Sequence, residues 1–536
     1  MDLEGNIISM PNKLMLNNID FEYICESTLP ETYCETKENF KVGEMEYKTV
    51  IVPACLTLRK TTVDFLEKFS RNGGHIIFMG DCPEYIDGEK SGYAAELYNK
   101  SEKCEINFEC LKNAVIGRKT VSIKNYKNET TGHFIYNLRR DNDEYYLFIA
   151  NAEKNTEYIP YGDEKCHHTV EIKGEFYPEI LNTFTGENEK VPFEIKNGYT
   201  FITYDFYEAT SLLLNLKPYS GEPSIEAKKL IIGEEIPLCG SLTYDMEEEN
   251  VCVLDTARWR IGGEEMHEKE ELLRLNAIVK KKFDIPEANP ATLYISAAKK
   301  AEHSVELEFE FNSEIDIDKL CFASEELLSI SVNGKEYDIE ADGYFVDKAI
   351  LKHPIGNIVK GKNKIRAVMP VSEYLTLEWC YLLGDFDVKI DKTEITLTKK
   401  SDAISFGNIV SHGKPFYSGN ITYNTNFTLQ NDASILVTIK KFRGYLVKVF
   451  IDGVDRGIIA FDPYNLKIDN LKKGEHTVSF KLFGTRNNTF GALHMVHDEE
   501  WMGPNIWYTK GDNWSYEYNL KDAGIIEKPV INIIEE

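Results

Sequence analysis

Two short stretches decide the expected fold: residues 330–334 read ISVNG, and residues 449–453 read VFIDG. Each is a run of β-forming residues that ends in Asn-Gly or Asp-Gly, a strong signal for a tight β-hairpin. In both places a Gly turn and a further strand follow, at 357–368 and 470–482. The shared order predicts a divergent internal repeat of two jelly-roll sandwiches. The competing interpretation is two unrelated β domains that use the same common turns.

The chain before this repeat is expected to form an α/β domain and then a β-sandwich. Residues 47–53 and 75–80 are short apolar strands, and an amphipathic helix expected at 61–72 joins them into a parallel βαβ unit. Antiparallel hairpins follow, with turns at 139–143 and 196–198. The expected domains are a partial α/β domain (1–113), a β-sandwich (114–218), a connector (219–290) with a helix at 264–283, jelly roll 1 (291–390) and jelly roll 2 (391–536).

The composition excludes some classes of partner. The 536 residues include 61 Lys and Arg against 88 Asp and Glu, which gives a net charge of −27. No strongly basic segment occurs, so we expect neither nucleic acid nor a membrane as a partner. The sequence contains no apolar run of the roughly 18–20 residues needed for a membrane span and no secretory signal. The 11 cysteines are spread singly, which predicts reduced thiols and a cytoplasmic protein.

Several longer motifs resemble the C-terminal, non-barrel half of bacterial glycoside hydrolases of the α-L-rhamnosidase family (family 106) and family-two-like sugar-binding-domain proteins. The motifs are NVCVLD (250–255), LEWCYLLGDFDV (377–388), PFYSG (415–419) and LFGTRNNTFGALH (482–494). Residues 47–83 are similar to the glutamine-amidotransferase-like (flavodoxin-like) domain that follows the catalytic barrel in those proteins. The resemblance implies a mainly β, multi-domain chain whose jelly rolls are of the galactose-binding-like type.

The resemblance also sets the expected function. A catalytic barrel needs about 200–250 residues of repeated βα units, and only about the first hundred residues here have an α/β pattern. The barrel is therefore expected upstream, and no catalytic residue is assigned. The predicted function is the accessory portion of a rhamnosidase- or galactosidase-like glycoside hydrolase that acts on O-glycosidic bonds. The alternative is a non-catalytic carbohydrate-binding or oligomerisation module. The expected partners are a carbohydrate ligand and either the upstream barrel or a second copy of the chain.

Five residues are candidates for carbohydrate contact. Trp501, Trp507 and Trp514 lie close together in the C-terminal tail, and aromatic rings stack on the apolar faces of pyranoses. Glu378 and Trp379 are an unusual carboxylate and indole within an apolar stretch. The competing interpretation is that the tail rings pin the tail onto the last sandwich and that Glu378 makes a structural hydrogen bond.

One possible nucleophile is interpreted as structural. Cys55 follows the first apolar strand, where an amidotransferase nucleophile would lie. However, it has no flanking Gly and no downstream His–Glu pair. A structural thiol is therefore favoured.

Metal binding is not expected either. His494 and His497 do not have the helical ligand spacing of a zinc site. Asp452, Asp455 and Asp462 lie near turns, where β-sandwich modules sometimes bind Ca²⁺, but they form no Asp-x-Asp-x-Asp loop. The prediction is no cofactor, with Ca²⁺ as the alternative.

Overall fold

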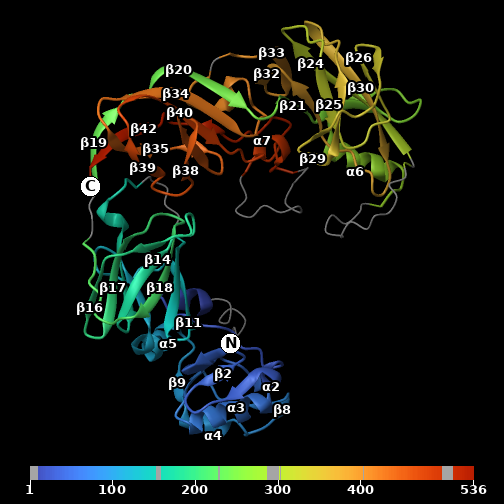
Figure 1. The fold of residues 1–536 in the computed structure, drawn as a ribbon. Helices are drawn as coiled ribbons and strands as arrows, with labels where there is room; N and C mark the ends of the chain where they lie inside the picture. Colours follow the sequence, from blue (N-terminus) through green and yellow to red (C-terminus); the bar gives the residue numbers. More distant parts are fainter. Residues whose placement is uncertain are drawn as a thin grey trace. The chain divides into compact units, whose positions relative to one another are not determined.

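A computed structural model of the protein describes residues 10–152, 159–226, 230–286, 301, 303–402, 404–497 and 511–535. The chain divides into two compact units: Met1–Lys229 with Phe461–Pro463, and Leu230–Ala460 with Tyr464–Glu536. The protein is mainly β, as the sequence predicts, with an α/β part only at its N-terminal end (Figure 1). Among the described helices, none combines the length and apolarity that a membrane crossing requires.

The first unit begins with the expected βαβ arrangement. Strand β4 (Thr49–Val52) pairs in parallel with β6 (His75–Met79), and helix α3 (Lys60–Arg71) connects them. Strand β9 (Glu102–Cys104) adds a third parallel strand beside β6. Helix α3 buries its apolar face, including Phe69, in the core of this α/β domain.

Smaller elements surround this parallel sheet. They are α2 (Leu29–Thr32), β1 (Tyr33–Glu35), β2 (Phe40–Val42), β3 (Met45–Tyr47), β5 (Thr57–Leu58), β7 (Tyr85–Ile86), β8 (Glu89–Lys90), α4 (Ala95–Lys100) and α5 (Phe108–Val115). Strands β1–β3 form a separate antiparallel sheet, and β5, β7 and β8 form a mixed sheet in which β5 and β7 are parallel.

A two-sheet sandwich completes the first unit. One sheet has the order β10 (Val121–Lys124), β13 (His167–Lys173), β17 (Tyr199–Asp205) and β16 (Phe193–Lys196). The other has the order β11 (Phe134–Asp141), β12 (Glu144–Asn151), β18 (Ser211–Pro218), β14 (Phe176–Leu181) and β15 (Asn188–Lys190). The two hairpins expected from the sequence are β11–β12 and β16–β17, and both are confirmed.

The second unit contains both jelly rolls. The first is built from β21 (Asn250–Leu254), β22 (Thr256–Arg260), β23 (His267–Glu271), β24 (His303–Ser313), β25 (Leu320–Ser324), β26 (Ser329–Val332), β27 (Lys335–Tyr337), β28 (Tyr344–Phe345), β29 (Asp347–Ile355), β30 (Gly361–Val371), β31 (Cys380–Gly384), β32 (Phe386–Asp391) and β33 (Glu394–Lys399). The second is built from β19 (Ile231–Ile236), β20 (Cys239–Met246), β34 (Ile421–Leu429), β35 (Ala433–Thr438), β37 (Val447–Ile451), β38 (Val454–Ile459), β39 (Asn465–Leu471), β40 (Gly474–Leu482) and β42 (Val530–Glu535). One continuous hydrophobic core runs through both.

The two jelly rolls repeat the same topology. One sheet has the order β21-β31-β25-β29 in the first and β19-β42-β35-β39 in the second. The other sheet has the order β22-β24-β30-β26-β27 in the first and β20-β34-β40-β37-β38 in the second. The first jelly roll adds β28 and β23 at its sheet edges. The internal repeat predicted from the two hairpin turns is therefore present in the strand order.

The segment expected as a connector is instead part of both jelly rolls. Strand β19 pairs with β42 and β20 pairs with β34, so both belong to the second jelly roll (Figure 1, green strands beside orange and red ones). Strands β21, β22 and β23 belong to the first. The first jelly roll is thus inserted between strands of the second. The sequence did not reveal this because the partners of β19 lie near the other end of the chain.

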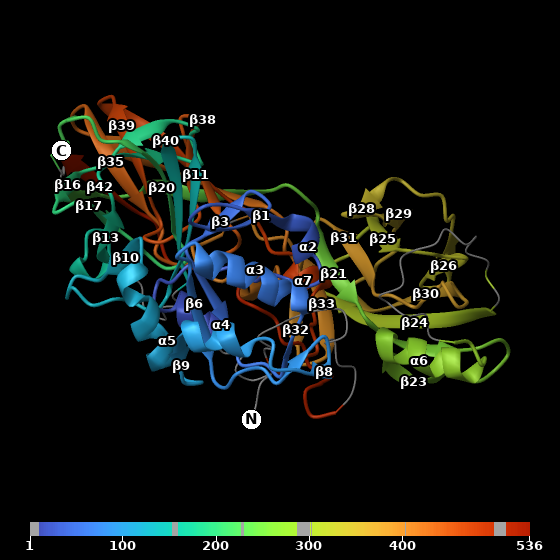
Figure 2. The same cartoon turned by 90° about the horizontal axis from the view of Figure 1, so that it is seen from below.

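The helix in this segment is shorter than expected. Residues 267–271 form β23 against β22, and helix α6 runs only from Leu272 to Lys282, beside β23 and β24 (Figure 2). Glu271 ends the strand and caps the helix, because its carboxylate accepts the N–H groups of Leu273 and Arg274. The apolar pattern of residues 272–279 marked the helix correctly, but it did not show where the helix begins.

Candidate functional site

Three of the five candidate residues can be placed in the structure, and they lie near one another. Trp501 and Trp507 fall outside the described residues. Trp514 and Trp379 both approach the ring of His494, with ring centroids 5.6 Å and 6.3 Å away. Glu378 precedes Trp379 in the chain and is partly buried. The sequence thus singled out residues from distant segments that meet at one place.

Asp255 is the central acceptor of this place. It lies where the chain crosses from β21 to β22, and its side chain is only 1 % exposed. One carboxylate oxygen accepts a hydrogen bond from the Tyr518 hydroxyl at 2.8 Å, and the other lies 3.0 Å from His494 Nε2. Asp255 therefore ties two residues of the C-terminal segment to the first jelly roll.

Glu271 is a second buried carboxylate beside Asp255. Besides capping α6, it accepts a hydrogen bond from the indole N–H of Trp379 at 2.7 Å. Its negative charge lies at the positive end of the helix dipole. We name the group formed by Asp255, Glu271, Trp379, His494, Trp514 and Tyr518 the Asp255 cluster.

The pKa values of the cluster reflect burial and pairing. Burial by itself lowers the pKa of His494, but the hydrogen bond and charge of Asp255 outweigh it, and the net shift is upward. Burial raises the pKa of Glu271, although three hydrogen bonds from Trp379 and the helix N–H groups oppose the shift. Burial also raises the pKa of Glu378, whose carboxylate accepts a hydrogen bond from the Thr376 hydroxyl. His494 is thus held toward its charged form against Asp255.

The motifs quoted from the sequence converge on this cluster. NVCVLD ends in Asp255, LEWC contains Trp379, and GALH ends in His494. The PFYSG motif contributes Phe416, whose ring packs edge-on against Tyr518 at 5.1 Å between centroids. The Thr489 hydroxyl donates to the carbonyl of Phe416 and links two of the motifs directly.

Trp514 also belongs to a more exposed aromatic surface. The Arg274 guanidinium lies over the Trp514 ring, 4.3 Å from its centroid, and forms an ion pair with Glu270 at 2.9 Å. Tyr516, which is 44 % exposed, packs edge-on against Trp514 and donates its hydroxyl to the same carboxylate. One face of Trp514 is therefore occupied by Arg274.

A polar groove of about 850 Å³ borders the cluster at Tyr518. Its lining includes Glu314, Lys389, Lys392, Lys399, Ser411, Glu517 and Asn519. Asp387 also lines the groove, and it forms a buried ion pair with Lys414 at 2.9 Å. The groove therefore offers amide, hydroxyl, ammonium and carboxylate groups next to a tyrosine ring.

Of the other chemical candidates, Asp452 and Asp455 are engaged in local contacts, and Cys55 and Asp462 are partly buried. Burial raises the pKa of the Cys55 thiol to about 11, which opposes thiolate formation. Asp452 contacts His476, and Asp455 forms an ion pair with Lys448. Burial raises the pKa of Asp462 to about 6. Among the described residues, no three His, Cys, Asp or Glu side chains are grouped so that they could hold a metal ion.

The sequence did not identify Glu271 and Arg274. The signal available was local: two Glu residues directly precede the apolar helix pattern, as N-terminal capping residues often do. This signal could predict a helix cap. It could not predict the contact with Trp379, which is 108 residues away in the chain.

Comparisons with known proteins found similar chains among solved structures. No family model and no curated protein matches the sequence. Among solved structures, 97 % of the chain aligns with 36 % of a rhamnosidase from Novosphingobium sp. PP1Y, at 13 % identity and a TM-score of 0.47. An α-L-rhamnosidase from Streptomyces avermitilis aligns over 77 % of this chain and 38 % of its own, at 11 % identity and a TM-score of 0.22. An exo-carrageenase from Bacteroides ovatus aligns over 40 % and 27 %, at 15 % identity and a TM-score of 0.24. The chain thus spans about a third of the first of these enzymes.

Proposed function

We propose that this chain is the carbohydrate-binding, non-catalytic portion of a glycoside-hydrolase-like protein. The observation that carries the proposal is the convergence of the sequence motifs on the Asp255 cluster, of which Tyr518 borders a polar groove. In this proposal a sugar lies along the groove and contacts Tyr518, Trp514 and Tyr516. The groove supplies polar groups for sugar hydroxyls, and the rings supply apolar surface for pyranose faces.

The buried carboxylates support a binding role over catalysis. A glycosidase needs two carboxyl groups that face each other across the sugar, about 5–10 Å apart. Asp255 and Glu271 are each about 1 % exposed, and both accept hydrogen bonds from protein groups. Glu378 accepts from Thr376. All three carboxyl groups are therefore engaged in hydrogen bonds with protein groups.

Binding by such a surface is expected to be weak. An aromatic contact contributes about 1–2 kcal/mol, and a few such contacts with hydrogen bonds give an affinity in the millimolar range, about −4 kcal/mol. A module of this kind contributes mainly through avidity with a neighbouring catalytic domain or a second copy.

The test is a titration of the purified chain with rhamnose-, galactose- and glucose-containing oligosaccharides, followed by tryptophan fluorescence. Trp514→Ala should weaken binding about fivefold to tenfold, because it removes the ring against which the exposed Tyr516 packs, next to Glu517 and Tyr518 of the groove. Tyr445→Ala is the matched control, since Tyr445 is an aromatic residue that is 68 % exposed elsewhere on the second jelly roll. If no oligosaccharide changes the fluorescence or is bound in calorimetry, the proposal is wrong.

A second measurement separates binding from catalysis. The purified chain should not hydrolyse nitrophenyl glycosides of the same sugars, and Glu378→Gln should change nothing in this assay. Turnover that Glu378→Gln abolishes would show that the chain has an active site of its own.

A further inference from the structure

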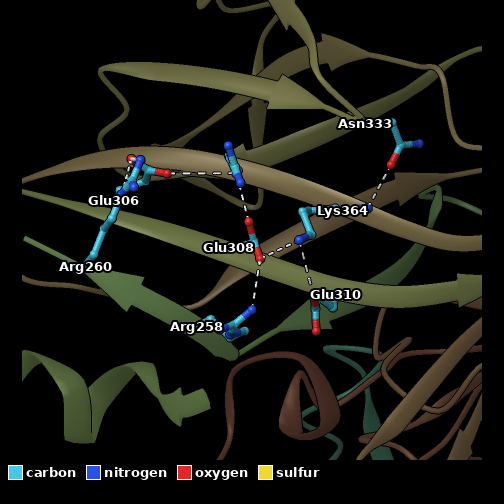
Figure 3. A network of polar contacts seen from close by, with 8 residues as sticks. Arg258, Arg260, Glu306, Glu308, Glu310, Asn333 and Lys364 are labelled. Atoms are coloured by element: carbon cyan, nitrogen blue, oxygen red, sulfur yellow. Dashed lines mark hydrogen bonds and ion pairs between the residues drawn. The ribbon is translucent and has the colours of Figure 1, made fainter. Parts of the chain in front are cut away.

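The first jelly roll carries a ladder of charged side chains on one face of its larger sheet (Figure 3). The charges lie on four adjacent strands, and the register of these strands places them on the same side. We name this group the charged face; it consists of Lys269, Arg258, Arg260, Glu306, Glu308, Glu310, Lys364 and Arg366.

Glu308 is the centre of the charged face. Its side chain is 2 % exposed and lies 2.7 Å from Lys364 Nζ, 2.8 Å from Arg366 Nε and 3.7 Å from Arg258 Nη1. Burial alone would raise the pKa of Glu308, but the hydrogen bonds from Lys364 and Arg366 outweigh it and hold the pKa below its usual value. Three cations are thus fixed in place around one carboxylate (Figure 3).

The charged face has more cations than carboxylates. The ion pairs connect five cations with three carboxylates, in a chain whose net charge is −27. By register, Lys362 and Glu336 at the margins add one charge of each sign. Arg366 is half exposed, binds Glu308 through Nε at 2.8 Å and also lies 3.9 Å from Glu306. Its guanidinium is therefore held by two carboxylates while half of the side chain stays accessible to a ligand.

The second jelly roll shows that the fold does not require these charges. The row Arg258–Glu308–Arg366 of the first jelly roll corresponds by strand register to Thr243–Asn424–Ser479 of the second. In that neutral row the Ser479 hydroxyl donates to the side-chain oxygen of Asn424 at 2.6 Å. Asn424 also donates to the carboxylate of Asp245 at 2.8 Å. The same topology thus forms without charged side chains at these three positions.

We propose that the charged face binds an oligosaccharide that contains uronic acid units. The carboxylate of a uronic acid pairs with an Arg fork, and its hydroxyls donate to carboxylates such as Glu306 and Glu310 at the rim. A nucleic acid or an acidic peptide fits less well, because a dense row of anions without hydroxyl donors would be repelled by these two carboxylates. The inference rests on the proposed carbohydrate binding and specifies the class of sugar and a second binding surface.

The experiment compares two ligands of equal length by calorimetry: a galacturonic acid oligosaccharide and the corresponding neutral galactose oligosaccharide. The uronate should bind about fivefold to tenfold more tightly at low salt. Arg366→Gln should remove this preference and leave binding of the neutral ligand unchanged. Arg366→Lys should restore part of the preference, since it keeps the charge without the fork. Lys472→Gln, which removes an exposed ion-paired lysine of the second jelly roll, is the control.

The outcomes show whether the uronate site fails alone or whether the proposed carbohydrate binding fails with it. If the neutral sugar binds and the uronate binds no more tightly, the charged face is not a uronate site, whereas the proposed function stands. If neither sugar binds, the proposed function also fails. A poly-glutamate peptide that binds as tightly as the uronate would overturn the assignment to a saccharide. Should Arg366→Gln fail to fold, Arg258→Gln tests the same preference, because two cations remain on Glu308.

Discussion

The two jelly rolls have the same strand order but differ in the chemistry of equivalent positions. Both use a left-handed residue followed by Gly at the first hairpin, Asn333-Gly334 in one and Asp452-Gly453 in the other. The side-chain oxygen of Asn333 accepts the N–H of Lys364, and that of Asp452 accepts the N–H of Thr477, both at 2.9 Å. The turn is therefore closed by the same hydrogen bond in both repeats.

Away from this turn the repeats diverge. In the first, the row around Glu308 is ionic, whereas the matching row of the second has Asn424 in the place of Glu308 and no charge among its three residues. Beside the turn it is the second repeat that carries ionisable side chains. Asn333 of the first contacts the amide of Asn363, whereas Asp452 of the second contacts His476. Turn geometry and the apolar core hold the topology, so the polar positions are free to take up different functions.

The largest expected effect is on the free energy of unfolding. It comes from Asp255, an acidic residue between two strands of the first jelly roll that has no acidic counterpart in the second. Asp255 lies between β21 and β22, whereas the matching crossover from β19 to β20 is Pro237-Leu238. Asp255→Ala leaves His494 and Tyr518 buried without their acceptor and should lower the free energy of unfolding by about 3–5 kcal/mol. Urea unfolding of the whole chain measures this.

The control for this variant is Asp385→Ala. Asp385 pairs with Lys400 at 2.7 Å, but its side chain is 80 % exposed, so its loss should change stability little. An equal effect of the two variants would contradict the importance assigned to Asp255.

The two glycine turns should respond alike if the repeat is genuine. Gly361 and Gly474 have φ values of +110° and +143°, and a Cβ at either would meet no atom within 4 Å. The cost of Gly→Ala is therefore backbone strain alone, about 1–2 kcal/mol at each position. Gly263→Ala is the control, because Gly263 also has open space but does not have a positive φ. Clearly different losses at the two turns would mean that their backbones differ.

These turns also explain how much of the fold the sequence could reveal. Asn-Gly, Asp-Gly and isolated Gly residues act on their own neighbours, so both hairpins and the repeat are predictable from local patterns. The insertion of one jelly roll into the other depends on β19 pairing with β42, and no local pattern records that partner. The same reason applies to the site: Trp514 and Trp379 were visible as unusual residues, but the contact of Asp255 with His494 joins positions 239 residues apart.

The ionic ladder should contribute more to stability than its neutral counterpart. Glu308→Gln removes the buried charge and leaves Arg258, Lys364 and Arg366 facing one another. The expected loss is about 1–2 kcal/mol. Asn424→Ala breaks the hydrogen bonds of this uncharged side chain with Ser479 and Asp245 in the second jelly roll and should cost about 0.5–1 kcal/mol. Raising the salt concentration should change the first loss more than the second. Losses of equal size and equal salt dependence would show that the charges of the first repeat have no special effect.

The smallest expected effect is a pH dependence confined to the turn of the second jelly roll. Burial lowers the pKa of His476, but its hydrogen bonds to Asp452 and to the Lys472 carbonyl outweigh this, and the net shift is upward. Burial raises the pKa of Asp452, but the bonds from His476 and the Thr477 N–H leave it below its usual value. Stabilisation from His476 is complete below its unfolded pKa of about 6.5 and is lost as the pH rises through the raised folded value. Stabilisation from Asp452 is present above its unfolded pKa of about 3.9 and is lost as the pH falls through the lowered folded value.

The pair should therefore stabilise the turn most between about pH 4 and pH 6.5. His476→Asn copies the neutral amide of Asn363, so the difference in unfolding free energy between the natural chain and this variant should be larger at pH 5.5 than at pH 8.5. His494 titrates in the same direction, but it is present in both proteins and cancels from the difference. The matched change in the first jelly roll, Asn363→Ala, removes an uncharged contact, and its effect should not vary over this pH range. A difference for His476→Asn that stays constant from pH 5.5 to 8.5 would mean that the Asp452–His476 contact acts as a neutral hydrogen bond, like its counterpart in the first repeat.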